Sequence, residues 1–196
     1  MSRALVSVYD KTDLEDFSRF LESLELEIVS SGGTARYLSE RGLRVTPVGD
    51  VTGFPEVLDG RVKTLHPVVH AGILARRGNP EDMATLRKHS IKKVDWVVVN
   101  LYPFREKQRE LDDEAELLEF IDIGGPTLIR AAAKNFRDIL VVSDPSDYPW
   151  IMEEYHRCGN IDISGRRYLA EKVFRTMSEY DRGIADFLRE DHAGRD

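Results

Sequence analysis

Polar and glycine-rich residues follow two apolar segments near the start of the chain. The first group is Ser7-Val-Tyr-Asp-Lys-Thr12 and the second is Ser30-Ser-Gly-Gly-Thr34. Each leaves a predicted strand and enters a predicted helix, where free backbone N–H groups and the helix dipole favour an anion. Gly33 lets backbone amides approach such an anion, Lys11 adds a charge, and Thr34 is expected to cap its helix. Singly, each group could be an ordinary turn, but two on neighbouring strands favour a phosphate pocket.

A basic segment, Arg61-Val-Lys-Thr64, offers two cations and a hydroxyl. If the segment is extended, Arg61 and Lys63 lie on one side of it. Arginine offers phosphate a bidentate fork and lysine a point charge, whereas a solvated basic loop is the alternative. His66 and His70 have the spacing of a metal pair. No acidic partner completes the pattern and a proline lies between them, so no metal site is expected.

Two further groups of residues have the types needed to handle a flat heterocycle. Asn100 and Tyr102 follow the most apolar segment of the chain, and a polar amide beside an aromatic ring suits such a ligand. A proline-bent loop with a packed aromatic residue is the competing interpretation. Asp122 precedes Gly124 and Gly125, whose N–H groups could stabilise a developing negative charge as an oxyanion hole does.

Lys134 lies near the end of the helix predicted for Thr127–Asn135. A lysine at a helix end can simply complement the helix dipole. On spacing alone, that role is favoured over catalysis.

The elements that must position these residues alternate along the chain. The predicted strands are Ala4–Val8, Leu26–Val29, Arg44–Val48, Val94–Asn100 and Ile139–Val142. The predicted helices are Leu14–Leu24, Thr34–Leu38, Ala115–Ile121 and Thr127–Asn135, and Arg105–Glu116 is expected to be an exposed loop. This alternation indicates a doubly wound, mostly parallel α/β sheet. Polar residues at strand ends would then meet along the carboxyl edge of the sheet.

The last part of the chain has a different pattern. Within Ser164–Leu188 no strand is predicted, and apolar residues recur at helical spacing, with a possible bend at Gly183. We expect a helical extension over residues 164–191, packed on its own domain or on a twin chain. Residues 1–196 are expected to form a single domain together with this extension.

Composition excludes several classes of protein. The 196 residues carry a formal net charge of −7, which argues against a general nucleic-acid binder. The single cysteine, Cys158, cannot form a disulfide within the chain. No apolar run is long enough to span a membrane, and the first residues lack the apolar core of a signal peptide. We therefore expect a cytoplasmic protein with no nucleic-acid or membrane partner.

Four blocks stand in a fixed order: SSGGTA, TGFPEVLDGRVKTLHPVVHAGILARR, NLYPF and DIGGPTLIRAAAKN. With these blocks the chain resembles, from Leu5 to about Phe187, the IMP cyclohydrolase domain that forms the N-terminal part of the bifunctional purine biosynthesis enzyme. The resemblance implies a methylglyoxal-synthase-like three-layer α/β sandwich and a homodimer. It also implies a purine nucleotide substrate: 5-formamidoimidazole-4-carboxamide ribotide would close to IMP and water.

The resemblance also implies roles for individual positions. Those at the reaction centre are Lys63, Tyr102, Asp122 and Lys134. Those implied or expected to bind substrate are Ser7, Lys11, Ser31, Gly33, Thr34, Arg61, Thr64, Asn100, Ile123 and Gly124. Tyr9 departs from the family, because many relatives carry a small hydroxyl residue there. No cofactor and no metal are expected, and a separate formyl-transfer enzyme would supply the substrate.

Two other functions fit parts of the same pattern. A non-catalytic nucleotide sensor would need the phosphate-binding groups, but not Tyr102, Asp122 and Lys134 together. A methylglyoxal synthase would share the fold and the phosphate pocket, but would not explain the DIGGPTLIRAAAKN block. The joint presence of the three residues therefore favours the cyclohydrolase.

Overall fold

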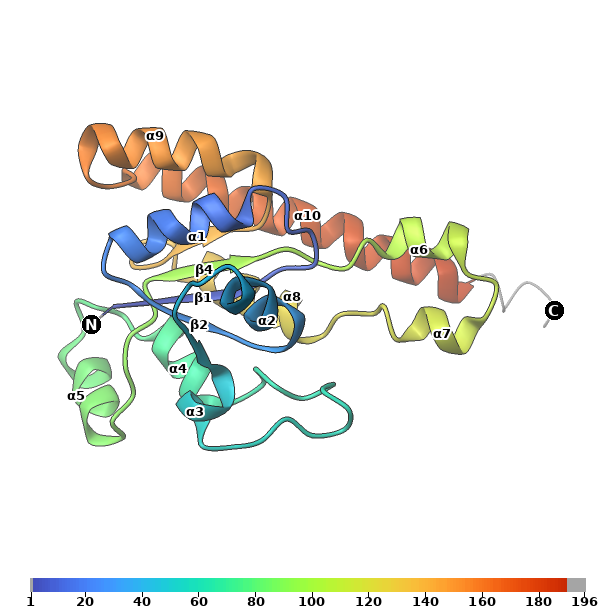
Figure 1. Cartoon of the computed structure of the whole chain (residues 1–196), viewed down its shortest axis with the longest axis horizontal. Helices are drawn as coiled ribbons and strands as arrows, with labels where there is room; N and C mark the ends of the chain where they lie inside the picture. The colour runs from blue at the N-terminus through green and yellow to red at the C-terminus, as the bar shows by residue number, and fades with distance from the viewer. Residues whose placement is uncertain (1, 190–196) are drawn as a thin grey trace.

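The computed structural model describes residues 2–189 and contains a five-stranded sheet (Figure 1). The strands are β1 (Arg3–Ser7), β2 (Glu27–Ser30), β3 (Val45–Pro47), β4 (Trp96–Val99) and β5 (Leu140–Val142). Their order is β3-β2-β1-β4-β5 and every neighbouring pair is parallel. The five strands expected from the sequence are confirmed close to their predicted bounds. The sheet, expected to be mostly parallel, is parallel throughout.

Strands β4 and β5 are buried along their whole length. A parallel strand with helices on both faces has no solvent-facing side, which explains why these segments are continuous apolar runs. Figure 1 shows α1 (Leu14–Ser23) and α9 (Tyr148–Cys158) above the sheet, with α3 (Val48–Thr52) and α4 (Pro67–Leu74) below it. The expected α/β sandwich is confirmed.

An aromatic cluster packs α1 against α9. The ring of Phe17 on α1 stacks on that of Tyr148 with centroids 4.1 Å apart, and both rings are buried. The ring of Trp96 on β4 packs edge to face with that of Phe17, with centroids 6.1 Å apart. Such pairs add stability beyond the burial of their surface. The cluster therefore joins two helices and a central strand into one core.

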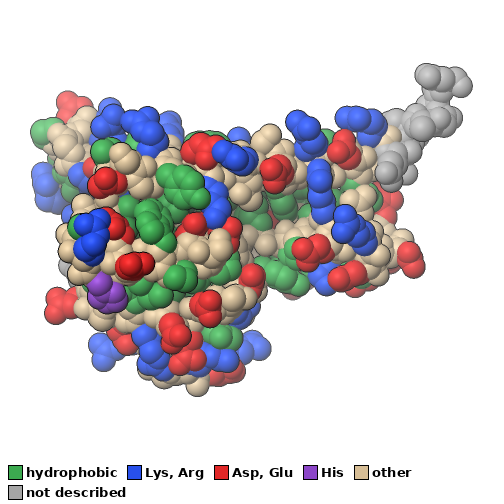
Figure 2. All heavy atoms as spheres, turned by 90° about the horizontal axis from the view of Figure 1, so that it is seen from above, with side chains coloured by type: hydrophobic (Ala, Val, Ile, Leu, Met, Phe, Trp, Pro, Cys, Tyr) green, Lys and Arg blue, Asp and Glu red, His purple; other side chains and the backbone are tan. Residues whose placement is uncertain are grey.

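The carboxyl and amino edges of the sheet carry different helices. Near the carboxyl edge lie α2 (Gly32–Glu40), α6 (Phe104–Glu110), α7 (Glu114–Leu118) and the start of α8 (Gly124–Lys134). Near the amino edge lies α5 (Pro80–Lys88), and a 3-10 turn at Pro145–Asp147 precedes α9. The long helix α10 (Ile163–Arg189) packs on α8 and β5. In Figure 2, α6, α7 and the second half of α10 form an arm beside the broader body of the molecule.

Several helices differ from the sequence prediction. The segment expected to be the exposed loop Arg105–Glu116 overlaps α6 and the start of α7, because Phe104 and Leu117 at its two ends are buried and anchor it. The helix expected at Ala115–Ile121 is confirmed as α7, with shifted ends. Pro67 begins α4 rather than disturbing it, and Pro80 begins α5. Proline is favoured in the first turn of a helix, where its missing N–H would have no partner.

The C-terminal helix is confirmed over Ile163–Arg189, and residues 190 and 191 of the expected extension lie outside the described residues. The helix continues through Gly183, where the sequence predicts a possible bend. A Cβ atom at Gly183 would lie 2.9 Å from Nε of Arg105, so this glycine allows α6 to approach α10 closely. No helix within residues 2–189 is both long and apolar enough to cross a membrane.

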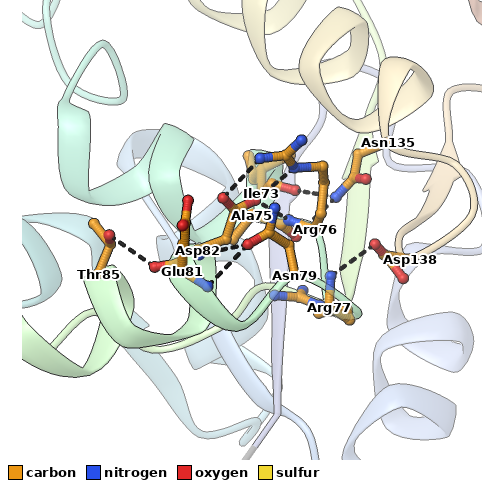
Figure 3. Close-up of polar contacts among 10 residues, drawn as sticks. All are labelled: Ile73, Ala75, Arg76, Arg77, Asn79, Glu81, Asp82, Thr85, Asn135 and Asp138. Atoms are coloured by element: carbon orange, nitrogen blue, oxygen red, sulfur yellow. Dashed lines mark hydrogen bonds and ion pairs between the residues drawn. The ribbon is translucent and has the colours of Figure 1, made fainter.

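A polar cluster holds the connection between α4 and α5 at the end of α8 (Figure 3). The side-chain amide of Asn135 donates to the carbonyl groups of Ile73 and Ala75, at 2.8 and 3.2 Å. Asp138 accepts a hydrogen bond of 3.0 Å from the backbone N–H of Arg77. These contacts fix the amino edge of the sheet, opposite the edge where ligands are expected to bind.

Candidate active site

A cavity of about 690 Å³ opens at the carboxyl edge of the sheet. Thirteen of the fourteen expected site residues line it, although they come from five separate segments of the chain. They are Ser7, Lys11, Ser31, Gly33, Thr34, Arg61, Lys63, Thr64, Asn100, Tyr102, Asp122, Ile123 and Gly124. Three of these segments follow β1, β2 and β4, and parallel topology brings them together because all strands end at the same edge. The segments at Arg61 and Asp122 lie in the connections after α3 and α7 instead.

The start of α2 forms one wall of the cavity. Ser31 stands at the N-cap, and Gly32 adopts the left-handed φ of +53° that suits glycine. A Cβ atom at Gly32 would lie 3.0 Å from Nζ of Lys63. The first N–H groups of α2 and a lysine amine therefore share one region of the cavity. This combination is suited to an anion such as a phosphate.

Thr34 has a different role from the helix cap that the sequence predicts. It lies inside α2, where its hydroxyl accepts a hydrogen bond of 3.1 Å from the N–H of Val8 and donates one of 2.9 Å to the carbonyl of the same residue. The Thr34 side chain is thus already occupied, and it ties α2 to the loop after β1. At this wall, Ser31 and the backbone N–H groups in the first turn of α2 can meet a ligand.

The basic segment is a tight turn rather than the extended stretch that the sequence predicts. Val57 and Val62 form an isolated antiparallel bridge. Three residues between them have left-handed φ angles, namely Leu58 at 55°, Asp59 at 52° and Gly60 at 84°. The turn reverses the chain, so that both basic residues that follow still line the cavity.

Each of the two cations of this turn is paired with a carboxylate. Nζ of Lys63 lies 3.3 Å from Glu56, and the guanidinium of Arg61 lies 2.9 Å from Glu119. The second pair joins the basic turn to the segment after α7, across the cavity. The side chains of Arg61 and Glu119 are 65% and 59% exposed, so water screens their attraction.

The side chain of Asn100 also differs from its expected role in recognising a heterocycle. Its Oδ1 atom accepts hydrogen bonds from the N–H groups of Tyr9 and Asp10, at 2.7 and 2.9 Å. Its Nδ2 atom donates to the carbonyl of Asp10 at 2.8 Å. The amide therefore joins the ends of β1 and β4, between which the strand order reverses, and it shapes the cavity by holding a loop.

Tyr102 pairs with Tyr9 at the cavity wall. Their ring centroids are 5.1 Å apart and each residue is 40% exposed. Partial burial, followed by the nearby charge of Asp122, raises the pKa of Tyr102, so its hydroxyl stays protonated at neutral pH. The two rings offer aromatic surface to a flat ligand.

Asp122 lies at the start of α8 with its side chain largely withdrawn from water. Burial raises the pKa of its carboxyl group, although hydrogen bonds from the backbone of Gly125 and Gly124 act in the opposite direction. The N–H of Gly125 donates to Oδ1 of Asp122 at 2.9 Å. The prediction that these glycines form an oxyanion hole is therefore corrected, because their amides hold the Asp122 carboxylate instead. A buried carboxyl with a raised pKa is suited to acid–base work.

Lys134 is the expected site residue that the cavity does not include. It is the last residue of α8, whereas Gly124, which lines the cavity, is the first. The helix has eleven residues in all. Its first and last residues therefore lie roughly 15 Å apart along the axis at 1.5 Å per residue. Lys134 therefore does not join Lys63, Tyr102 and Asp122 in the cavity of its own chain, and whether it serves the site of a neighbouring chain stays open.

Sequence reasoning missed several residues that line or support the cavity. Two of them are the glutamates that pair with the cations. Glu119 lies far from Arg61 in the sequence, and Glu56 lies in unremarkable charged surroundings. Tyr180 of α10 contacts the backbone of Asp122, yet in the sequence it is one apolar residue in a helical stripe. Only three-dimensional proximity reveals these partners.

A second cavity of about 860 Å³ adjoins the first. Both cavities are lined by Tyr9, Lys11, Asn100 and Tyr102, and the second extends toward β5, α6 and α10. The loop after β1 that Asn100 holds thus lies between the two cavities. Within residues 2–189, no group of three or more potential metal ligands occurs, and the ring of His66 caps α4 by accepting from the N–H of Val68 at 3.2 Å.

The parallel sheet and the anion-binding edge define an MGS-like α/β domain. The family model described as MGS-like domain matches residues 13–127, and the model described as AICARFT/IMPCHase bienzyme matches residues 132–195. The chain belongs to the MGS-like domain family, and its C-terminal part matches the bienzyme. The resemblance to the cyclohydrolase domain is thereby confirmed.

The chain is similar to bacterial proteins named bifunctional purine biosynthesis protein PurH. It is 56% identical to that of Clostridium beijerinckii over 189 residues and 52% identical to that of Clostridium botulinum strain Loch Maree over 191 residues. The matches cover 96% and 97% of this chain but only 38% of each relative. A solved structure, that of ForH, is 33% identical with a TM-score of 0.85, covering 96% of this chain and 97% of that one.

Proposed function

We propose that this chain is an IMP cyclohydrolase, which closes 5-formamidoimidazole-4-carboxamide ribotide to IMP and water. The observation that carries the proposal is the convergence, in one cavity, of an anion-binding wall with Lys63, Tyr102 and Asp122. The similarity to proteins named for purine biosynthesis supports the same substrate class.

The reaction requires positioning and proton transfer. The carboxamide nitrogen attacks the formyl carbon of the same molecule, which forms the C–N bond and places negative charge on the formyl oxygen. That oxygen takes up protons and leaves as water. The carboxamide nitrogen and the formamido nitrogen each lose one proton, and a C=N bond forms between the former formyl carbon and the formamido nitrogen. An amide nitrogen is a poor nucleophile. Holding the carboxamide nitrogen against the formyl carbon therefore accounts for much of the acceleration.

The basic turn links the two parts of the site. Lys63 lies beside Gly32 at the start of α2, where we place the ribose phosphate. The next residue, Thr64, lies beside the start of α8, because a Cβ atom at Gly124 would be 3.0 Å from its Oγ1 atom. A ligand with its phosphate at α2 would therefore present its base toward Asp122 and Tyr102. In this arrangement Asp122 accepts a proton from the carboxamide, and Lys63 donates to the departing oxygen.

A nucleotide-binding domain without catalysis is the second candidate. It is favoured by one observation, the hydrogen bond between Gly125 and the carboxylate of Asp122, which is the arrangement of a simple helix cap. Such a domain would bind ribotides at the same cavity but would leave them unchanged.

Turnover distinguishes the two candidates. The purified chain is incubated with the formylated ribotide, and the absorbance of the purine product is followed. We expect Asp122→Asn to lower kcat by about 10²-fold, the scale of one acid–base group. Asp138→Asn is the matched control, because Asp138 also accepts from a backbone N–H but lies at the other edge of the sheet. Binding of the ribotide without turnover would support the second candidate.

A further inference from the structure

Tyr180 on α10 contacts the segment that carries Asp122. Its hydroxyl accepts a hydrogen bond of 2.8 Å from the backbone N–H of Asp122. The same hydroxyl is 3.2 Å from the carbonyl of Phe120, to which it donates. One side chain thus satisfies two backbone groups of a loop that is 58 and 60 positions away in the sequence.

The loop between α7 and α8 depends on this contact. Phe120 and Ile121 donate their N–H groups back to the last turn of α7, and Gly125 belongs to α8. Asp122 lies between these two helices, and its N–H donates to the Tyr180 hydroxyl. Losing that hydroxyl would leave a half-buried N–H group without its partner and the carbonyl of Phe120 without its donor. The loop would then have to move to satisfy them.

The Tyr180 ring is itself held in place. It lies 6.5 Å from the ring of Phe104, which is buried and also packs on Phe187 at 5.6 Å. Burial raises the pKa of Tyr180 to about 12, so that its hydroxyl carries the proton it donates throughout the neutral range. The contact is therefore made by a protonated hydroxyl whose ring is packed against a buried neighbour.

We propose that Tyr180 is a positioning residue, which acts through the backbone of Asp122 to set the place of its carboxylate in the cavity. The proposal rests on the proposed function, because it assigns Tyr180 to the same reaction. It gives α10 a part in the site beyond covering the sheet. This helix lies within residues 132–195, which match the bienzyme model rather than the MGS-like one.

The test compares Tyr180→Phe with Tyr155→Phe in the full chain. The first variant keeps the ring and removes only the hydroxyl. The second removes the hydroxyl of a half-buried tyrosine on α9, which packs against Phe20 and Trp96 away from both cavities. Amide hydrogen exchange of residues 120–122 is measured first, because it requires no turnover. We expect about 10-fold or faster exchange in Tyr180→Phe and no change in Tyr155→Phe.

Kinetics with the formylated ribotide form the second part of the test. We expect Tyr180→Phe to lower kcat by about 10-fold while KM changes by less than about 3-fold. The reason is that the start of α2, where we place the phosphate, is untouched. The acidic limb of the kcat profile should also move to lower pH. Burial raises the pKa of Asp122, and a loosened loop admits water that returns this pKa toward its ordinary value.

Each outcome decides one of the two proposals. Unchanged exchange at residues 120–122 would overturn the role of Tyr180, whatever the activity. Faster exchange with an unaltered kcat and pH profile would also overturn it, because the loop would then not position the reacting group. A parent chain that binds the ribotide and fails to convert it would overturn the proposed function alone, and hydrogen exchange would still decide whether Tyr180 holds the loop.

Discussion

At the mouth of the cavity, Arg61 is held by Glu119 and Lys63 by Glu56. A phosphate can replace a carboxylate at an arginine because it offers the same bidentate geometry with more charge. Binding of substrate at this wall would then exchange one anion for another. The two basic residues are not equivalent, since the Arg61 side chain is 65% exposed and that of Lys63 only 29%.

For Arg61→Ala we expect KM for the ribotide to rise by about 10-fold while kcat changes little. This is the lower end of the range for a charge-assisted hydrogen bond, because water screens an exposed arginine. Arg175→Ala is the control, because Arg175 is equally exposed and is paired with Glu171 far from the cavity. An unchanged KM in Arg61→Ala, with a normal fold, would remove Arg61 from the phosphate site.

The side chains of the site were predictable by type more than by contact. Thirteen expected residues line one cavity, and those that follow β1, β2 and β4 were predictable there because parallel strands end at one edge. What these side chains do there was not predictable. The hydroxyl of Thr34 and the amide of Asn100 are engaged by backbone groups of the loop after β1, and those groups become neighbours only in the folded sheet. No local pattern in the sequence records such partners.

At the scale of elements, the turn from Val57 to Val62 decides where Lys63 lies. Two features of position 60 favour glycine: the left-handed φ of +84° and the close approach of Lys63, which leaves no room for a side chain. A Cβ atom there would lie 2.8 Å from Nζ of Lys63 and closer still to Cε. An alanine at this position would therefore push the lysine out of its position.

We expect Gly60→Ala to lower kcat/KM by about 10-fold or more through displacement of Lys63. Gly42→Ala is a matched control, because Gly42 has a similar φ of +79° and no atom within 4 Å of its would-be Cβ. Both variants carry the same backbone strain, about 1 kcal/mol. Thermal unfolding should show equal losses of stability in the two variants. An equal loss of activity would contradict the role given to Gly60.

Strands were easier to predict than helices in this chain. The buried strands are uninterrupted apolar runs, as in β4, and their type survives any error at the ends. The segment of α6 was assigned to a loop because it is charged along most of its length, and its stability comes from the burial of Phe104 against α10. A proline was interpreted as breaking a helix at Pro67, although it begins one there. Tertiary packing outweighs local preference in the first case. In the second case, the sequence interpretation overlooked a local preference, that of proline for the first turn of a helix.

At the scale of the whole molecule, the position of Lys134 bears on assembly. It is exposed at the end of α8 remote from the cavity of its own chain. We propose, as the resemblance implies, that the chain forms a homodimer. If Lys134 takes part in the reaction, it must then reach the cavity of the partner. A symmetric dimer would supply each cavity with one lysine from the other chain.

Mixing two inactive variants tests this arrangement. Asp122→Asn and Lys134→Ala each disable both sites of their own dimers, but a mixed dimer contains one site with both native residues. After unfolding and refolding together, we expect about a quarter of the parent activity to return, since half of the dimers are mixed and one site in two is intact. No recovery, with mixed dimers confirmed by mass, would place Lys134 outside the partner's site. Full activity of Lys134→Ala alone would remove it from the reaction.

Helix α10 runs from its first turn, where Arg166 donates to the carbonyl of Ile161, to the aromatic residues of the arm. Tyr180 lies in its second half, and its hydroxyl is the partner of the Asp122 amide. Any fluctuation that opens this turn of α10 releases Asp122, even while the sheet and the phosphate wall stay intact. If Asp122 transfers a proton as proposed, the fraction of molecules competent for that step is a Boltzmann population set by the local opening free energy of one helical turn. Warming should lower this population before the molecule unfolds, so activity would decline at a temperature below the midpoint of global unfolding.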